Sequence, residues 1–357
     1  MRRHLGNGFF KIKARFKNTS AKPGYPFRPI LIRPLAMPPG SPKISILMSV
    51  YNDERFLPLA LDSLRAQTEA DFEVIVLDDC SSDGTAALLR QAQAQDERFR
   101  VFRPDRRQGL TANLNQALSY ARGDLIARMD SDDLSDPKRL ERQAAFLREH
   151  PNVGVAGCFF EKIDANGHTL ETQTTLPLDD TGIRQYLQGG NPLCHGAVII
   201  RKSVLTALNG YRPCFKVAQD YDLWLRIPPE WQFANIPEVL YSHRRHGWSI
   251  SYQKRLLQHQ MKSLALTLYR ERQHAPDHLD ALDRLTDATA QQAFIERFMR
   301  QDLRENHARY SHLFLETGRR SLRHRQRKEA RQQLQMAIQL NPWQLKAYRY
   351  WLEAYLG

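Results

Sequence analysis

The strongest constraint on the fold is an alternation of short apolar runs with helically spaced segments in the first part of this 357-residue sequence. The apolar runs, each short enough to be a buried strand, are residues 44–50, 72–77, 101–103 and 125–129. The helical segments between them are residues 57–67, 86–95 and 110–121. Strands that alternate with helices indicate a mostly parallel sheet with helices on both faces. The sequence therefore predicts an α/β domain.

Acidic residues follow the second and fourth of these predicted strands. Asp79 comes after the second strand, and Asp130, Asp132 and Asp133 follow the fourth. In open α/β sheets, ligands bind at the carboxyl ends of the strands. Carboxylates packed this closely repel, and Mg²⁺ relieves the repulsion by taking one or two carboxylates plus substrate phosphates. The pattern predicts a divalent-cation site for a diphosphate substrate. A plain helix cap at Asp133 or Ser135 is the alternative interpretation of the turn.

The pattern changes after about residue 255. Residues 256–357 have long segments of helical period and only two prolines, Pro276 and Pro342, so we expect a helical C-terminal region packed on the first domain. Residues 328–343 resemble the second half of a tetratricopeptide unit, and an isolated helical pair needs a neighbour to bury its face. The basic stretch 319–331 is typical of a solvated helix face.

The net charge of +13 is concentrated at the N-terminus. Residues 1–43 hold ten Lys and Arg and no acid, which leaves 42 basic and 39 acidic groups in the other 314 residues. Residues 1–42 are predicted to be a basic, Pro-rich extension, either solvated or in contact with an anionic membrane surface through its aromatic and basic segment 9–16. Because the basicity is not a property of the folded domain, the charge argues against nucleic-acid binding.

The remaining composition narrows the class of protein. With 42% apolar and 25% charged residues, the chain is neither collagen, nor wholly disordered, nor a disulfide scaffold. No apolar run approaches the ~18–20 residues that span a membrane, and no secretory signal is visible. The four cysteines match no zinc or redox pair and are predicted to be free thiols in a cytoplasmic protein: Cys80, Cys158, Cys194 and Cys214.

A series of ordered motifs over roughly residues 43–251 resembles family 2 glycosyltransferases. The motifs are SILMSVYN at 45–52, VLDDCSSDGT at 76–85, GL at 109–110 leading to Asn115, ARMDSDD at 127–133, NPLCH at 191–195, RKS at 201–203, GY at 210–211 and QDYDLWLR at 219–226. The resemblance implies a Rossmann-like GT-A fold over residues 43–255. It also implies a nucleotide-sugar donor, Mn²⁺ or Mg²⁺, and inversion at the anomeric carbon.

The resemblance also implies donor-binding residues. Tyr51 matches the residue that stacks near the base, and Ser49 lies beside it. Asp79 matches the acid that reads the uracil ring, and Arg107 is expected to neutralise the diphosphate. Asp130 and Asp132 match the Asp-x-Asp motif that contacts ribose and metal, with Asp132 as the principal metal ligand.

Asp220 matches the catalytic base, which deprotonates the acceptor hydroxyl as that hydroxyl attacks the sugar. Gln219 precedes it where many relatives have Glu, and this removes a neighbouring charge but not the base. Asp222 is the rival, and helical geometry places the two side chains about 200° apart, so both cannot face one site. A helix N-cap is the alternative role for Asp220.

Two aromatic positions and a loop complete the expected site. His195 is expected in the acceptor or donor sugar pocket, with a structural histidine as the alternative. Trp224 is interpreted as a core residue in preference to a sugar platform. Segment 241–251 is similar to the family's closing loop, in which Arg244 or Arg245 and Ser249 would reach the diphosphate and neutral His246 would bind the metal. A solvated loop is the alternative.

The sequence thus predicts a metal-dependent, inverting hexosyl- or N-acetylhexosaminyltransferase that uses a UDP-sugar. The expected acceptor is a glycan or lipid-linked hydroxyl in bacterial capsule, lipopolysaccharide or exopolysaccharide synthesis. The expected location is the cytoplasm, with peripheral contact at the inner face of the cell membrane. A nucleotidyltransferase is one alternative, although residues 51–55 stand where its Gly-rich phosphate loop would be. A binding protein without turnover is another, and the retention of all four aspartates argues against it: Asp79, Asp130, Asp132 and Asp220.

Overall fold

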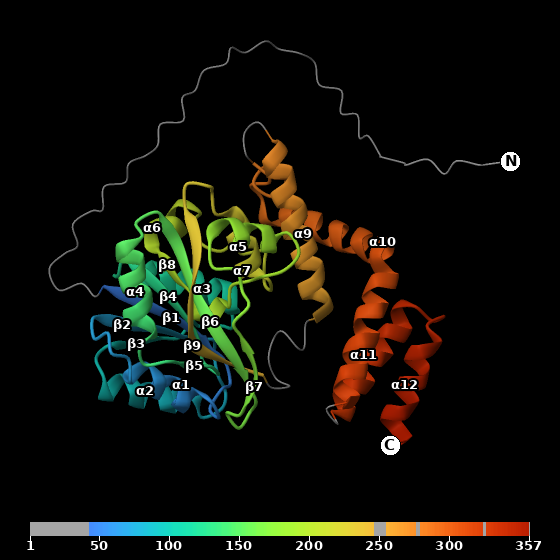
Figure 1. Cartoon of the computed structure of the whole chain (residues 1–357), viewed down its shortest axis with the longest axis horizontal. Coiled ribbons are helices and arrows are strands. Elements are labelled where there is room, and N and C mark those ends of the chain that lie inside the picture. The colour runs from blue at the N-terminus through green and yellow to red at the C-terminus, as the bar shows by residue number, and fades with distance from the viewer. Residues whose placement is uncertain (1–42, 246–254, 276–278, 324–325, 357) are drawn as a thin grey trace, which may run out of the picture. The chain divides into compact units, whose positions relative to one another are not determined.

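The computed structural model describes residues 43–245, 255–275, 279–323 and 326–356 (Figure 1). The predicted N-terminal extension, with its aromatic and basic segment, lies outside the described residues. So do His246 and Ser249, for which the predicted roles stay predictions.

The predicted parallel strands form one half of a single sheet. They lie in the order β3-β2-β1-β4, and every neighbouring pair is parallel. The strands are β1 (Ile44–Val50), β2 (Phe72–Asp78), β3 (Phe99–Phe102) and β4 (Leu125–Asp130). The helices that connect them are α1 (Leu57–Arg65), α2 (Thr85–Gln95) and α3 (Leu110–Tyr120). Apolar runs and helical spacing therefore predicted both the type and the approximate bounds of these elements.

The sheet continues beyond β4 as a mixed half with antiparallel pairings, which local sequence patterns did not indicate. β8 (Ile199–Arg201) pairs antiparallel with both β4 and β6 (Val153–Ile163). β9 (Gln232–Arg244) runs parallel to β6 and antiparallel to the short β5 (Leu134–Ser135). β7 (Thr169–Gln173) pairs with the end of β6. This second half brings β9 next to the acidic turn after β4.

Alternating residues of the central strands enter two separate apolar clusters, one on each face of the sheet. Ile46 and Met48 of β1 pack with α1, α2 and α4 (Arg139–Glu149). Leu47 packs on the other face, in a cluster that includes α3, α5 (Asp180–Leu187), α6 (Lys202–Ala207) and α7 (Gln219–Arg226). The period-2 alternation of a strand explains why neighbouring residues enter different clusters.

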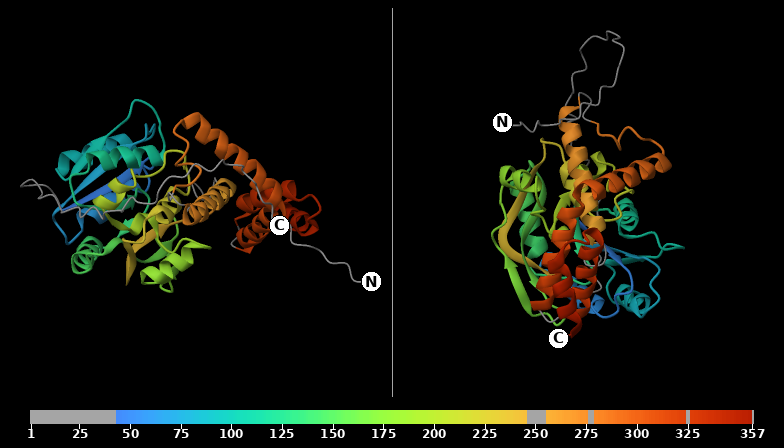
Figure 2. Two further views of the ribbon diagram at one scale, coloured as in Figure 1. Left: turned by 90° about the horizontal axis from the view of Figure 1, so that it is seen from above. Right: turned by 90° about the vertical axis from the view of Figure 1, so that its right-hand side faces the viewer.

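The region from residue 255 onward is helical, as the sequence predicts. It consists of α9 (Arg255–His274), α10 (Ala288–Arg323), α11 (Arg327–Leu340) and α12 (Leu345–Leu356). Leu264 and Leu268 of α9 belong to the same apolar cluster as Trp224 of α7. α11 and α12 lie side by side (Figure 2) and bury a third, smaller apolar cluster with α10. Among the described helices, not even the 36-residue α10 carries an apolar stretch sufficient to cross a membrane.

Buried ion pairs reinforce the contact between α9 and the α/β part. Arg212 bonds to Asp222 at 3.1 Å and to Asp280 at 2.7 Å, and Arg272 of α9 also donates to Asp280. Asp280 is completely buried. Burial alone would raise the pKa of this carboxyl, but the positive charge of Arg212 lowers the pKa below its ordinary value. The carboxylate is therefore charged and holds two arginines together.

We predict that Asp280→Asn lowers the free energy of unfolding by about 3 kcal/mol, because removal of one partner leaves buried charges uncompensated. The measurement is the urea-unfolding curve of the full chain. Asp62→Asn is the matched control, because Asp62 forms an exposed ion pair with Arg65. Its loss should cost less than about 0.5 kcal/mol. Equal effects of the two substitutions would contradict the role of Asp280.

Candidate functional site

The register of the parallel strands brings the predicted donor-binding residues to one edge of the sheet. Ser49 pairs with Asp130 across β1 and β4, and Val50 pairs with Asp78 across β1 and β2. Tyr51 and Asp79 follow directly on these positions. Residues far apart in the sequence therefore meet at the carboxyl ends of the strands, where open α/β sheets bind ligands.

An aromatic ring, a cation and a carboxylate lie together on the β2 side of this edge. The guanidinium of Arg107 lies 3.5 Å from the centroid of the Tyr51 ring, and its Nε is 3.5 Å from Asp79 Oδ2. Asp79 is buried and also accepts backbone N–H groups from Gln108 at 2.8 Å and Gly109 at 3.0 Å. Gly109 has φ +87°, a conformation that favours glycine, so it suits the sharp turn that aims these donors at Asp79. The ring of Tyr51 is 40% exposed and accessible for stacking.

Asn113 of α3 supports the same edge through its amide. Its Nδ2 donates to Ser49 Oγ at 2.9 Å, and its Oδ1 accepts from Gln108 Nε2 at 2.8 Å. Asn113 is fully buried. The amide therefore links the end of β1 to the loop that carries Arg107.

Three aspartates lie at the end of β4 and in the turn that follows, and contacts within the protein offset the repulsion at Asp130 and Asp133. Asp130 accepts from Nη2 of the buried Arg128, whose Nη1 donates to the carbonyls of Leu47 and Met129. Asp133 accepts from Tyr241 Oη at 2.8 Å and from the backbone N–H of Arg244 at 2.6 Å. Burial and the neighbouring charges of Asp132 and Asp130 raise the pKa of the Asp133 carboxyl well above its usual range.

The side chain of Arg244 is fixed by hydrogen bonds to backbone carbonyl groups near the acidic turn. Its side chain is buried, and it donates to the carbonyl of Asp132 at 2.7 Å and to that of Asp164 at 3.0 Å. Arg244 therefore fixes the Asp132 backbone and the end of β9 in place. Arg245, which the sequence offers as the alternative, is exposed.

The acidic turn is suited to a hard divalent cation. Asp130 has a side chain that is 35% exposed, and Asp132 is also partly exposed. The described residues contain no group of three or more side chains arranged to enclose a metal ion. Two partly exposed carboxylates match the donor set with which Mg²⁺ is held together with substrate phosphates. Asp133 is tied to β9, and the N-cap of α4 is Lys138, so Asp133 and Ser135 do not cap that helix.

Asp220 and Asp222 have separate environments on α7. Asp220 accepts from Asn191 Nδ2 at 2.8 Å, whereas the buried Asp222 is bonded to Arg226 at 2.8 Å and to Arg212. Burial raises the pKa of the Asp220 carboxyl above its ordinary value, and the positive charge of Lys262 on α9 opposes that rise. A partly buried carboxylate with a raised pKa has the properties of a general base. The N-cap interpretation of Asp220 is wrong, because Ala218 occupies the N-cap.

His195 and Trp224 lie close to this region. His195 Nε2 is 2.9 Å from Tyr211 Oη, and its ring meets Trp224 edge to face with centroids 6.1 Å apart. Burial lowers the pKa of His195 to about 3, so the imidazole is neutral at neutral pH. Trp224 is fully buried, which confirms its interpretation as a core residue.

Four residues that contribute to the site were missed as functional positions. Arg128, Tyr241 and Asn191 stand within or beside the quoted motifs, and a basic residue inside an apolar strand was an available signal for Arg128. Lys262 had no signal, because its proximity to Asp220 depends on the packing of α9 against α7.

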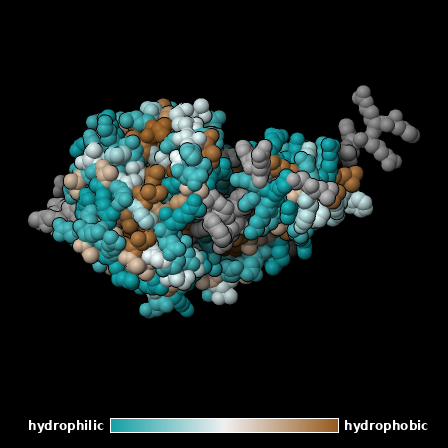
Figure 3. All heavy atoms as spheres, turned by 90° about the horizontal axis from the view of Figure 1, so that it is seen from below, coloured by the Kyte–Doolittle hydropathy of each residue, from teal (hydrophilic) through white to brown (hydrophobic). Residues whose placement is uncertain are grey.

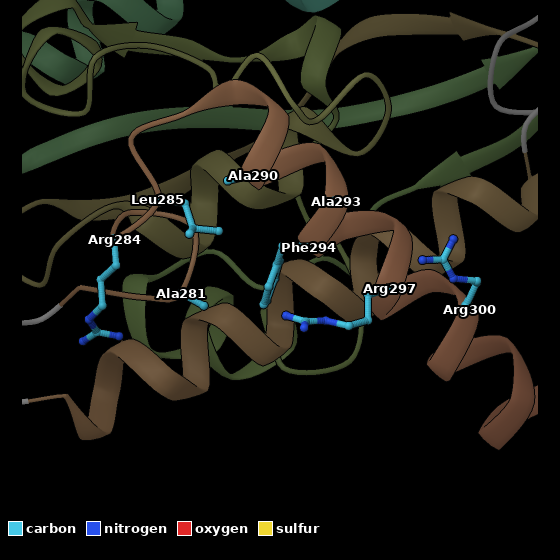
Figure 4. A pocket seen from close by; sticks show the side chains of 8 residues that line it. All are labelled: Ala281, Arg284, Leu285, Ala290, Ala293, Phe294, Arg297 and Arg300. Carbon is cyan, nitrogen blue, oxygen red and sulfur yellow. The ribbon is translucent and has the colours of Figure 1, made fainter. Parts of the chain in front are cut away.

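An open pocket of about 630 Å³ lies elsewhere, between the start of α10 and the segment before it (Figure 4). None of the predicted site residues lines this pocket. Its lining consists of Ala281, Arg284, Leu285, Ala290, Ala293, Phe294, Arg297 and Arg300.

The mixed sheet with its acidic strand ends is a fold of the GT-A type. A model of glycosyl transferase family 2 matches residues 45–208. The putative glycosyltransferase EpsE of Bacillus subtilis is 38% identical over 208 residues, which are 57% of this chain and 73% of EpsE. The chain belongs to glycosyl transferase family 2. The O-antigen biosynthesis glycosyltransferase WbnJ of Escherichia coli is 31% identical over 58% of this chain and 81% of its own length.

Solved structures share the fold at low sequence identity. TarS 1–349 of S. aureus in complex with UDP-GlcNAc aligns with a TM-score of 0.53 at 17% identity, over 88% of this chain and 89% of that one. The chain spans 54% of the longer TarS chain. The mannosyltransferase PcManGT of Pyrobaculum calidifontis, in complex with GDP-Man and Mn²⁺, aligns with a TM-score of 0.50 at 17% identity, over 90% and 91% of the two chains.

We predict that Lys262→Gln moves the acid limb of the pH profile of kcat/KM to higher pH. The Lys262 charge lowers the pKa of Asp220, so its removal lets that pKa rise, and more alkaline solution is then needed to ionise the Asp220 carboxyl, which the sequence predicts to be the catalytic base. The measurement is donor turnover as a function of pH. Lys138→Gln, on the exposed start of α4, is the control and should leave the limb in place. An acid limb that stays at the same pH in Lys262→Gln would contradict the predicted role of Asp220 as the catalytic base.

Proposed function

We propose that this protein transfers a sugar from a nucleoside diphosphate donor to a hydroxyl group of a glycan or lipid-linked acceptor, with inversion at the anomeric carbon. The observation that carries the proposal is the convergence of Tyr51, Asp79, Asp130 and Asp132 at the carboxyl edge of the parallel strands. The acceptor class is supported by WbnJ, whose name assigns it to O-antigen biosynthesis. The product in this proposal is a bacterial surface polysaccharide.

The proposed donor is a UDP-sugar that occupies the Tyr51 side of the edge. The exposed Tyr51 ring stacks on the base, and Asp79 accepts the N–H of uracil. Arg107, which now lies on the Tyr51 ring, moves to the diphosphate and exchanges a cation–π contact for a charge-assisted hydrogen bond. The complex of TarS with UDP-GlcNAc supports a uridine donor.

The proposed cofactor is Mn²⁺ or Mg²⁺, held by Asp132 and Asp130 together with the donor phosphates. Such a cation, when bound, offsets the charge that develops on the departing diphosphate. Arg244 and Tyr241 keep the acidic turn in position by holding the Asp132 carbonyl and the Asp133 carboxylate. The PcManGT complex with Mn²⁺ supports a divalent cation.

Asp220 is the proposed base, and Asn191 orients its carboxylate. It takes the proton of the acceptor hydroxyl as the oxygen attacks the anomeric carbon from the face opposite the diphosphate. One displacement of this kind inverts the configuration of the anomeric carbon. Asp222 holds two arginines instead and takes no part in proton transfer.

We predict that Asp132→Asn weakens metal-dependent donor binding by about 100-fold or more, because substitutions around metal ligands already cost about 10–100-fold. The measurement is calorimetric titration with a nucleotide-sugar panel in Mn²⁺, Mg²⁺ or EDTA. Asp71→Asn is the matched control, since Asp71 is exposed and immediately precedes β2, at the opposite edge of the sheet. Folded wild-type protein that binds no nucleotide sugar would refute the transferase proposal.

We predict that Asp220→Asn lowers kcat by about 10²–10⁴-fold, the range for loss of a general base. The dissociation constant of the donor should stay unchanged, because Asp220 acts on the acceptor. The readout is donor hydrolysis, in which water replaces the acceptor, and NMR of the first sugar released should show the inverted anomer. A retained anomer, or full turnover by the variant, would rule out this role for Asp220.

A further inference from the structure

Helix α12 carries an unusual concentration of exposed apolar side chains. Among the described residues, twelve large apolar side chains are exposed, and five of them lie within the thirteen residues 343–355. We call these five residues the α12 face. They are Trp343, Leu345, Tyr348, Leu352 and Tyr355, with exposures of 88%, 78%, 39%, 50% and 54%.

The spacing of these residues makes the exposed side chains a continuous stripe. Positions 345, 348, 352 and 355 fall on one side of a helix of 3.6 residues per turn, and Trp343 lies two residues before the start of that helix. Ala347 and Ala354, which are fully buried, point to a different side and pack in the cluster with α10 and α11. α12 is therefore apolar on two sides, and only one of them is covered within the described residues.

An apolar stripe that no other described residue covers requires an explanation. Outer helices of helical arrays usually carry a polar outer face. The face of the molecule shown in Figure 3 is mostly hydrophilic, and the hydrophobic residues on it occupy less of the surface than the hydrophilic ones. Contiguous exposed apolar residues on a soluble domain mark an interaction site.

The charges around the α12 face select the occupant. The segment 327–356 holds five basic and two acidic residues, and Arg331 lies 4.3 Å from the centroid of the Tyr355 ring. A second copy of the chain would bring two positive surfaces together, and like charges across an interface are unfavourable. An anionic lipid surface complements the charge. It also accommodates Trp and Tyr, which are enriched at membrane–water interfaces.

We propose that the α12 face docks on an anionic membrane surface, with α12 lying in the plane of the interface. The twelve residues of α12 extend about 18 Å at 1.5 Å per residue, which is too short to cross a bilayer but suited to lie on one. This docking is independent of sugar transfer, and it would bring the enzyme to lipid-linked acceptors.

The test is co-sedimentation of the full chain with vesicles of phosphatidylcholine, with and without 30 mol% phosphatidylglycerol (a proportion of roughly one anionic lipid in three). The variant carries Leu345→Ser, Leu352→Ser and Tyr355→Ser. The matched control carries Leu170→Ser and Tyr186→Ser, which remove side chains that are 58% and 47% exposed in the α/β part. Thermal unfolding and donor hydrolysis in solution verify that both variants are folded.

We expect wild type and control to bind the anionic vesicles and the α12 variant to bind at least tenfold more weakly. Equal binding by the variant and wild type would overturn the proposal, and so would equal losses in the variant and the control. Absence of vesicle binding by wild type would also overturn it. Sedimentation velocity tests the rival occupant, a second copy of the chain. A wild type that is dimeric and does not bind vesicles, together with a monomeric α12 variant, would assign the α12 face to a dimer interface.

Discussion

The crowding of three carboxylates at the end of β4 is the constraint around which the site is built. Asp130 ends β4, and Asp132 and Asp133 lie within the next three residues, so each negative charge makes ionisation of the other two carboxyl groups less favourable. The positive charge of Arg128 offsets the negative charge of Asp130, while Tyr241 and the backbone N–H of Arg244 hold Asp133. Because two of these partners belong to β9, the acidic turn is supported only when the mixed half of the sheet is assembled. Fold and site are therefore coupled through electrostatics.

Helix α7 shows how one short segment serves chemistry and architecture at once. Asp220 lies at the start of the helix, where Asn191 holds a carboxylate that keeps a raised pKa. Asp222, two residues on, faces another direction and neutralises Arg212 and Arg226. Helical geometry separates the two roles without any difference in residue type. The same helix receives α9, so the charge of Lys262 reaches Asp220 from a part of the chain that the family motifs do not include.

The parallel half of the fold was predictable because each strand is a short apolar run and each helix has apolar residues at helical spacing. The mixed half was not predictable, because β6 and β9 are separated by about 70 residues of sequence. The register between these two strands also shifts along their length, and residue spacing does not indicate such shifts. Asp79, Asp130 and Asp132 were identifiable from their places at strand ends and in motifs. The placement of Arg244 on the Asp132 carbonyl and the approach of Lys262 to α7 arise from tertiary packing, which residue spacing does not specify.

The shared core beneath α9 limits how this enzyme can be divided. Leu264 and Leu268 complete the cluster around Trp224, and Asp280 supplies the counter-charge for Arg212. A shorter catalytic fragment that ends before α9 would expose that cluster and would remove Asp280, leaving Arg212 with Asp222 as its remaining buried partner. Exchange of the helical region between relatives would succeed only where both the apolar contacts and the acid opposite Arg212 are reproduced. Modular recombination at this boundary therefore carries a structural cost.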